Sequence, residues 1–350
     1  MNLAIFLPNW VGDVVMSTPA LRAMREQFAN AHLIGIMRPY ISDVLSGTEW
    51  LDEQLFYDPR SKAPDMRILP LLRQLRKRDI DTALLFTNSF RTGMMAFLSG
   101  ARRRVGYAKY GRGPLLTDTL RFQKLRGRSV PAPTLDAYLE LTVLLGCKPK
   151  SRETELATTG DDERRADHVW DQLGLPNGRE VVVLNSGGAY GSAKSWPIEY
   201  FGELARRIAQ HHALSVLVIC GPKERQLAAQ IALHANHRRV VSLADQPFNI
   251  GLSKACVRRS RLMVSTDSGP RHFAAAFDVP VITLYGPTHI EWGDTHYARA
   301  IHLQEDMPCG PCMKRVCPEG HHRCMRDLTV NRVYSEVAKQ LDQPRHIEAA

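Results

Sequence analysis

The chain alternates short apolar runs with longer stretches in which apolar and polar residues recur at helical spacing. An uninterrupted apolar run of four or five residues, such as residues 181–184, is typical of a strand that is buried on both faces of a parallel sheet. Runs of this kind predict strands at residues 3–7, 32–37, 83–86, 181–184, 216–220, 240–243, 262–265 and 281–284. Helical spacing predicts helices at residues 71–77, 135–145, 161–173 and 198–208. Alternating strands and helices predict an α/β fold with doubly wound parallel sheets.

The alternation occurs twice, which indicates two domains. It lapses into a polar, charged stretch around residues 150–178 and then begins again at the run 181–184. With 350 residues, of which 44% are apolar, the chain can bury two cores of ordinary size. We expect two successive Rossmann-like domains with a cleft between them, at residues 1–175 and 176–350.

A glycine-rich turn at residues 186–193 follows the strand at 181–184 and leads to Lys194. This order of features can form a binding site for an anion, most simply a phosphate. The exposed backbone N–H groups of the turn, the lysine and the N-terminus of the following helix all favour negative charge. Residues 188–195 nearly match a phosphate-binding P-loop, but Ala193 replaces a required glycine and Pro197 places the helix start after the lysine. We therefore predict that Gly188 and Lys194 contact a phosphate from the loop. The alternative is an ordinary β–α connection.

Asp13 lies in the first β–α turn, where a dinucleotide-binding domain would carry several glycines. This turn has only Gly12, and a carboxylate there repels a diphosphate but can accept a proton from a hydroxyl. The alternative is that Asp13 only caps the N-terminus of its helix.

A second turn, at residues 264–272, places Asp267 at the carboxyl end of a strand, where α/β proteins bind ligands. Ser268 and Gly269 offer hydroxyl and backbone donors beside it. The strand at 281–284 is followed by a similar turn that contains Gly286 and Pro287. These turns predict one ligand site, with helix capping by Asp267 or Ser268 as the alternative.

The positive charge is concentrated in the first half of the chain. Residues 1–150 hold 22 Lys and Arg against 13 Asp and Glu, whereas residues 151–350 hold 24 against 23. This excess predicts a polyanionic ligand or an anionic surface as partner, although a merely solvated surface is the alternative. No nucleic-acid-binding motif accompanies the charge, so we expect no nucleic acid partner.

The N-terminus lacks a basic segment typical of export signals, and no apolar run is long enough to span a membrane. We therefore expect a cytoplasmic protein in which cysteines are reduced. Four of the seven cysteines lie close together, at Cys309, Cys312, Cys317 and Cys324, with His321 and His322 among them. This cluster predicts a structural zinc site, but its irregular spacing leaves free thiols as an equal alternative.

Four blocks, VGDVVMSTPALRAMR, GGAYGSAKSWP, TDSGPRHFAAA and LYGPT, together resemble the heptosyltransferases of lipopolysaccharide core assembly. The resemblance covers most of residues 1–290. It implies a GT-B fold, in which two Rossmann-like domains face a central cleft, and an inverting transfer that requires no catalytic metal. It implies ADP-heptose as donor in the second domain and a heptosyl-Kdo-lipid A acceptor in the first. Stimulation by Mg²⁺ stays open.

The resemblance also assigns roles to residues. Asp13 corresponds to the proposed catalytic base, and Lys194 to a lysine on the donor diphosphate. Glu224 falls near the donor ribose. The block beside the nucleotide sugar corresponds to Asp267, Ser268, Gly269 and His272. Arg271 departs from the family, which more often has a neutral residue there; it could add a phosphate contact or alter the choice of acceptor.

We expect basic residues of the first half, Arg60 and Lys62 among them, to face the acceptor and the anionic inner membrane, on which the protein would lie peripherally. Other classes stay open on sequence alone. They are a sugar-nucleotide epimerase of the same fold, a P-loop-like kinase or ATPase, and a basic module that binds nucleic acid.

Overall fold

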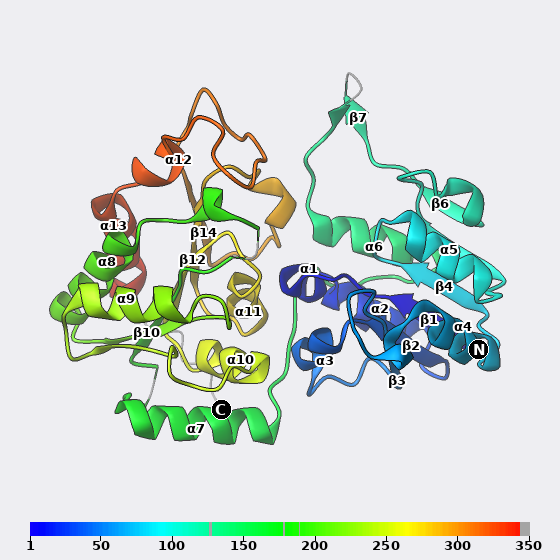
Figure 1. The fold of residues 1–350 in the computed structure, drawn as a ribbon, viewed down its shortest axis with the longest axis horizontal. Helices are drawn as coiled ribbons and strands as arrows, with labels where there is room; N and C mark the ends of the chain where they lie inside the picture. Colours follow the sequence, from blue (N-terminus) through cyan, green and yellow to red (C-terminus); the bar gives the residue numbers. More distant parts are fainter. Residues whose placement is uncertain (126–127, 178, 189, 344–350) are drawn as a thin grey trace. The chain divides into compact units, whose positions relative to one another are not determined.

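The computed structural model describes residues 1–125, 128–177, 179–188 and 190–343, and the chain divides into two compact units (Figure 1). Unit 1 contains Met1–Ala157 together with Glu291–His296, and unit 2 contains Thr158–Ile290 together with Tyr297–Ala350. Each unit is built on its own six-stranded parallel sheet. The α/β class and the two Rossmann-like sheets predicted from the sequence are confirmed.

The sheet of unit 1 has the strand order β3-β2-β1-β4-β5-β6, and every neighbouring pair is parallel. Its strands are β1 (Asn2–Phe6), β2 (His32–Met37), β3 (Glu53–Phe56), β4 (Thr82–Leu85), β5 (Arg103–Tyr107) and β6 (Asp118–Leu120). Its helices are α1 (Val11–Met16), α2 (Thr18–Gln27), α3 (Pro39–Leu45), α4 (Ile68–Lys77), α5 (Phe90–Leu98) and α6 (Thr134–Leu144). A small antiparallel pair, β7 (Lys124–Leu125) and β8 (Arg128–Ser129), follows β6.

The sheet of unit 2 repeats this order as β11-β10-β9-β12-β13-β14. Its strands are β9 (Val181–Asn185), β10 (Ser215–Ile219), β11 (Val240–Ser242), β12 (Leu262–Thr266), β13 (Val281–Tyr285) and β14 (Ala300–Gln304). Its helices are α7 (Gly160–Leu173), α8 (Ile198–His211), α9 (Arg225–Ala235), α10 (Ile250–Arg258), α11 (Arg271–Ala276), α12 (Arg323–Arg326) and α13 (Val330–Asp342).

The strand order creates one special edge in each unit. The first strand lies between the second and the fourth, so the chain reverses its direction of winding at β1/β4 in unit 1 and at β9/β12 in unit 2. In open α/β sheets, ligands bind outside the carboxyl ends of the strands at such a switch point. The turn that carries Asp13 follows β1, and the turns that carry Lys194 and Asp267 follow β9 and β12.

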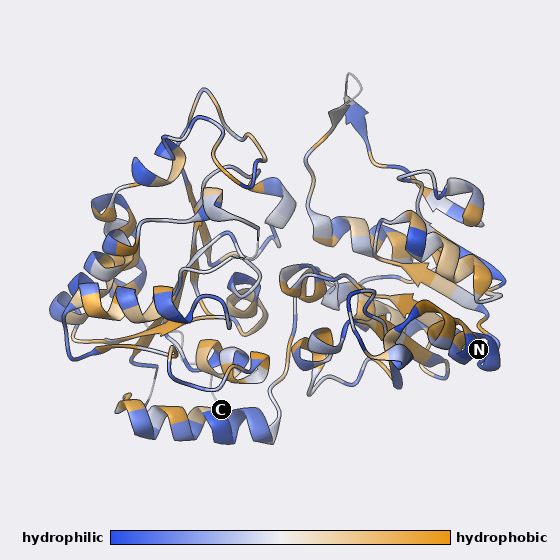
Figure 2. Ribbon diagram, in the orientation of Figure 1, coloured by the Kyte–Doolittle hydropathy of each residue, from blue (hydrophilic) through white to orange (hydrophobic). Residues whose placement is uncertain are grey.

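The core of each unit lies on its sheet. All residues of β9, β10, β12 and β13 are buried, as expected for strands that are covered on both faces. Figure 2 shows central strands such as β4 and β10 in the hydrophobic colour, whereas α7 carries both colours. The apolar burial that stabilises the fold therefore also fixes the carboxyl ends of the strands, where the candidate sites lie.

All eight predicted strands are present, and the structure adds three details to the expected organisation. The segment after Gly12 forms two helices, because Pro19 lies in the first turn of α2 and the Ser17 hydroxyl donates to the carbonyl of Val14 at 2.7 Å. The domain boundary lies before α7, which belongs to unit 2. A further strand, β14, follows the predicted strand at 281–284. In the described part of the chain, no helix is long and apolar enough to cross a membrane.

Candidate active site

The glycine-rich turn of unit 2 packs against other turns at the same sheet edge. The Thr266 hydroxyl donates to the carbonyl of Gly187 at 3.0 Å. A Cβ added to Gly187 would lie 2.9 Å from Cδ of Glu224, and one added to Gly188 would lie 3.6 Å from Cβ of Ser268. A side chain at position 187 would collide with Glu224, so glycine is required there. The predicted residues Gly188, Glu224 and Ser268 lie around this turn. Ala189, within the same turn, lies outside the described residues.

Lys194 ends a short 3₁₀ turn, Ser192–Lys194, and α8 begins four residues later at Ile198. This confirms that the lysine precedes the helix and does not lie on its first turn, as it would in a P-loop. The Lys194 ammonium forms an ion pair with the Asp267 carboxylate and donates to the Asp267 carbonyl at 3.1 Å. It also lies 4.4 Å from the centroid of the Tyr190 ring. These contacts within unit 2 therefore fix the position of the Lys194 ammonium group.

Asp267 is the centre of this cluster. Its carboxylate pairs with Lys194, accepts a hydrogen bond from Thr288 at 2.7 Å, and lies 3.4 Å from Nε of Arg271. Burial alone would raise the pKa of the Asp267 carboxyl, but Arg271 and Lys194 together lower it below its ordinary value. An ionised Asp267 between two cations therefore aligns the groups that a ligand diphosphate would meet.

Helix capping does not explain the Asp267 turn. The N-cap of α11 is Pro270, and no side chain caps that helix. Ser268 instead accepts a hydrogen bond from the Asn185 amide at 2.7 Å, and that amide also bonds Ser265 at 2.9 Å. The capping alternative for Asp267 and Ser268 is wrong. Gly269 completes the turn between Ser268 and Pro270.

His272 is buried, and its pKa lies well below the ordinary value because of burial and the nearby positive charge of Arg271. The ring is therefore neutral at physiological pH. Among the described residues, no hydrogen-bond partner reaches its buried Nδ1 atom. A neutral imidazole can position other groups in the turn, but it adds no charge for a phosphate.

Glu224 is fixed beside the same turn. Its carboxylate accepts a hydrogen bond from the Gly221 amide at 2.8 Å, and a Cβ on Gly221 would lie 2.3 Å from one of its oxygens. Glu224 is the N-cap residue of α9, although its side chain makes no capping bond to that helix. A positioned carboxylate at this edge can accept hydrogen bonds from the hydroxyls of a sugar ring.

In unit 1, Asp13 lies in the first turn of α1, three residues after the N-cap residue Trp10, whose side chain makes no capping bond. The proposal that Asp13 serves as the N-cap is therefore wrong, although a carboxylate in the first turn still interacts favourably with the helix dipole. Asp13 is half-buried. Burial and then the charge of Asp13 raise the pKa of the Tyr138 hydroxyl well above its ordinary value, which places the two side chains near each other.

Basic residues of unit 1 differ in their surroundings. Arg60 and Lys62 are exposed in the connection between β3 and the 3₁₀ turn Pro64–Met66. Arg103 and Arg104 instead serve the fold. Arg103 pairs with Asp118 at 2.8 Å, and Arg104 donates to the carbonyl of Leu115 at 2.7 Å. Arg103 and Arg104 are therefore engaged within unit 1, whereas Arg60 and Lys62 are exposed.

The cysteine-rich segment packs against the glycine-rich turn. The carbonyl of Arg315 accepts a hydrogen bond from the Ala193 amide at 3.0 Å, and the Tyr190 hydroxyl donates to the carbonyl of Met313 at 2.8 Å. All seven cysteines are free thiols. Burial, and then Cys317, Cys312 and Cys309, raise the pKa of Cys324. In the parts of the chain that are described, no three His, Cys, Asp or Glu side chains are arranged to hold a metal ion. The zinc site at Cys309, Cys312, Cys317 and Cys324 stays a prediction.

Sequence reasoning missed several residues of these sites. Thr288 and Asn185 position Asp267 and Ser268; Thr288 lies in the turn after β13, and Asn185 is the last residue of β9.

Two Rossmann-like units, one of them with a lysine–aspartate cluster at its switch point, match the two-domain organisation that the resemblance to the heptosyltransferases implies. The family model "Glycosyltransferase family 9 (heptosyltransferase)" matches residues 68–323, and the chain belongs to this family. It is 26% identical to lipooligosaccharide heptosyltransferase 2 of Campylobacter jejuni, over 97% of this chain and 99% of that protein.

Solved structures agree with this assignment. The structure of Escherichia coli ADP-heptose LPS heptosyltransferase II has a TM-score of 0.78 and 21% identity, and the match covers 97% of this chain and 98% of that one. The E. coli heptosyltransferase WaaC with ADP-2-deoxy-2-fluoro heptose has a TM-score of 0.70 and 17% identity, covering 97% and 99%. The chain is therefore a glycosyltransferase of the heptosyltransferase family, and the epimerase and kinase alternatives are not favoured.

Proposed function

We propose that this chain transfers a heptosyl group from ADP-L-glycero-D-manno-heptose to the heptosyl-Kdo-lipid A inner core of lipopolysaccharide, as a heptosyltransferase of type II. The observation that carries the proposal is the cluster of Lys194, Asp267 and Thr288 at the switch point of unit 2, in a chain of a heptosyltransferase family. The ADP-heptose named for one solved neighbour, and the ADP-heptose analogue bound in the other, support an ADP-sugar as donor.

An inverting transfer needs a base, because the acceptor oxygen becomes a better nucleophile as its proton leaves. We assign this role to Asp13. In the reaction, the acceptor hydroxyl oxygen attacks the anomeric carbon, the bond from that carbon to the diphosphate oxygen breaks, and Asp13 takes the hydroxyl proton. No metal is required in this scheme.

The departing ADP gains negative charge, so the transition state is stabilised by cations and aligned donors. Lys194 supplies the cation, and the backbone of the turns at Gly188 and Gly269 supplies N–H groups. Ser268 and the neutral His272 complete the sugar side of the site, and Glu224 receives ribose hydroxyls. Asp267 keeps Lys194 in place until the diphosphate arrives.

Unit 1 would bind the acceptor, with Arg60 and Lys62 on its phosphates, at the cytoplasmic face of the inner membrane. Both side chains are exposed, so their attraction for phosphates is screened by salt within about 10 Å at 0.1 M ionic strength. The acceptor KM should therefore rise with salt. A KM that ignores both salt and charge reversal at Arg60 and Lys62 would remove these two residues from the acceptor site.

Calorimetry with a panel of donors tests the donor assignment. ADP-heptose should bind more tightly than UDP-sugars, GDP-sugars and other ADP-sugars, and Lys194→Ala should weaken that binding while Lys223→Ala, an exposed lysine of the same unit, should not. Equal binding of all nucleotide sugars would contradict the assignment.

The zinc hypothesis stays a prediction. It requires about one zinc per chain in protein purified without added metal, with the four clustered thiols protected. The free-thiol alternative requires well under one zinc per chain and full titration of all seven thiols, and the arrangement of the described residues favours it. Elemental analysis together with thiol titration distinguishes them.

A further inference from the structure

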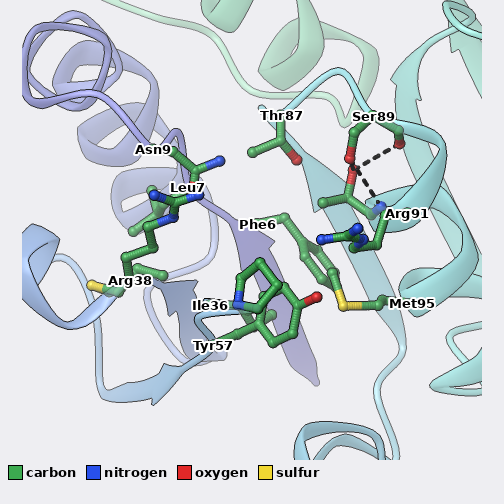
Figure 3. A pocket seen from close by; sticks show the side chains of 13 residues that line it. Phe6, Leu7, Asn9, Ile36, Arg38, Tyr57, Thr87, Ser89, Arg91 and Met95 are labelled. Carbon is green, nitrogen blue, oxygen red and sulfur yellow. Dashed lines mark hydrogen bonds between the residues drawn. The ribbon is translucent and has the colours of Figure 1, made fainter. Parts of the chain in front are cut away.

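Unit 1 contains a cavity of about 320 Å³ that no role described above uses. It lies at the carboxyl ends of β1 to β4, the switch edge of this sheet, and the first turns of α5 complete its wall (Figure 3). Its apolar side is formed by Leu7, Tyr57 and Met95 among others. A volume of this size is at the lower end of the range for small-molecule sites and accommodates a single sugar ring.

The charges that line this cavity have one sign. Its thirteen lining residues include Arg38 and Arg91 but no carboxylate, and Figure 3 shows these two arginines on opposite sides of it. Among the described residues, neither side chain has a hydrogen-bond or ion-pair partner. By contrast, Arg25 and Arg78 of the same unit pair with Asp52 and Glu53. Two unpaired guanidinium groups at one cavity favour an anion.

A third cation lies behind the wall. Arg112 is completely buried, and its guanidinium donates to the carbonyl of Tyr107 at 2.8 Å and to the Asn88 side chain at 2.9 Å. It also bonds the carbonyl of Thr87, a residue that lines the cavity. No carboxylate pairs with Arg112 in the described residues. Burial lowers the pKa of Arg112 to about 10, so its positive charge persists at neutral pH.

The N-terminus of α5 adds to the positive potential at the cavity. Ser89 caps α5, and its hydroxyl accepts a hydrogen bond from the Thr92 amide at 3.2 Å. The positive end of this nine-residue helix therefore lies at the cavity. A buried cation without a carboxylate costs free energy unless an anion nearby compensates it. Three guanidinium groups and a helix N-terminus exceed what the fold itself requires.

We propose that this cavity binds one anionic sugar residue of the acceptor, with its carboxylate or phosphate between Arg38 and Arg91 and its ring against the apolar side. Arg112 acts as a positioning residue, since it fixes Thr87 and contributes charge without touching the ligand. The inference rests on the proposed function, because the connection after β1 carries both Asn9 of the cavity and the proposed base Asp13. An anion held here orients the acceptor relative to that base.

The test measures binding separately from activity. Saturation-transfer NMR on the full chain uses three probes: free Kdo, which carries a carboxylate, mannose 6-phosphate, which carries a phosphate, and methyl mannoside, which is neutral. We expect an anionic probe to bind and the neutral one not to bind. The anionic probe that binds identifies the carboxylate or the phosphate as the group recognised.

The variant for this test is Arg38→Gln/Arg91→Gln, and the matched control is Arg121→Gln, an exposed arginine of the same unit outside the cavity. Losing charged hydrogen bonds should weaken binding of the anionic probe by roughly tenfold or more and raise the acceptor KM similarly. Donor affinity and melting temperature should not change.

Two results would overturn the inference: equal binding of neutral and anionic probes, or a double variant that binds them as the control does. If the chain fails to transfer heptose but binds an anionic probe through Arg38 and Arg91, the proposed function fails and the cavity assignment stands.

Discussion

At the scale of single residues, the proposed role of Asp13 as catalytic base can be tested by substitution, because Asp13 is not the N-cap residue of α1. Trp10 is the N-cap of α1, so Asp13→Asn removes the base without removing a cap. We expect the transfer step to slow by about 10²–10⁴. ADP-heptose affinity and the melting temperature should stay near those of the unchanged protein. Single-turnover kinetics measure the step, and Asp65→Asn, an exposed aspartate of the same unit, is the control. An Asp13→Asn protein that melts early yet keeps its turnover would make Asp13 a structural residue.

Lys194 should show a different pattern, because we propose that it binds the donor diphosphate. Removing it leaves the Asp267 carboxylate with Arg271 and Thr288 but deletes the cation intended for the diphosphate. Lys194→Ala should weaken ADP-heptose binding by roughly 10- to 100-fold, since hydrogen bonds to charged groups contribute about 1.5–3 kcal/mol. The rate should fall as well. Calorimetry reads the first effect, and unchanged donor affinity would show that Lys194 serves only Asp267.

The lowered pKa of His272 predicts how the free energy of unfolding depends on pH. Its pKa is lowered in the folded protein, so the unfolded chain binds more protons once the pH falls below about 6.5. Stability should therefore be lost as the pH falls from about 6.5 toward the folded pKa, by at most about 1.4 kcal/mol per pH unit from this residue. His272→Gln should flatten that part of the curve. Urea unfolding at several pH values measures the slope, and an identical slope in the variant would contradict the account.

At the scale of elements, the contact between the glycine-rich turn and the cysteine-rich segment can be tested with two glycines. Gly191 has φ +151°, and a Cβ there would lie 2.3 Å from the carbonyl oxygen of Arg315. Gly191→Ala should therefore separate the two segments, cost about 1–3 kcal/mol of stability and weaken donor binding. Gly188→Ala is the matched control for stability, because its Cβ would make an ordinary 3.6 Å contact with Ser268. Thermal melting compares them, and equal melting temperatures would mean that the segment does not hold the turn.

The elements also show where sequence reasoning succeeds. Strands such as β9 and β12 were predictable because burial on both faces requires continuous apolar runs. β3 and β6 were missed because they lie at the sheet edge, where polar residues are tolerated, and β5 was missed because it begins with two arginines. Arg112 could not be identified as buried, since its partners are carbonyl and amide oxygens of residues up to 25 positions away. The local pattern of apolar and polar residues predicts helices and strands, but it does not reveal contacts between residues that are far apart in the chain.

At the scale of the whole molecule, the same strand order in both units brings the sequence motifs together. Each motif follows the carboxyl end of a strand at or beside the switch point, so the motifs of one unit meet at one sheet edge although they are far apart in the chain. The division into units was predictable in outline from the repeated alternation. The return of Glu291–His296 to unit 1 was not, because it depends on contacts such as the 2.8 Å bond from the Thr134 hydroxyl to the carbonyl of Trp292.

The central claim is that this chain moves heptose from ADP-heptose to an acceptor. The most direct measurement incubates the purified chain with ADP-heptose, with and without heptosyl-Kdo-lipid A, and follows ADP release together with the mass of the acceptor. We predict that ADP is released in proportion to acceptor molecules that each gain one heptosyl group, and that both changes nearly stop without acceptor or with Asp13→Asn. Conversion of ADP-heptose to a free sugar or an isomer at the same rate without acceptor, with the acceptor mass unchanged, would contradict the account.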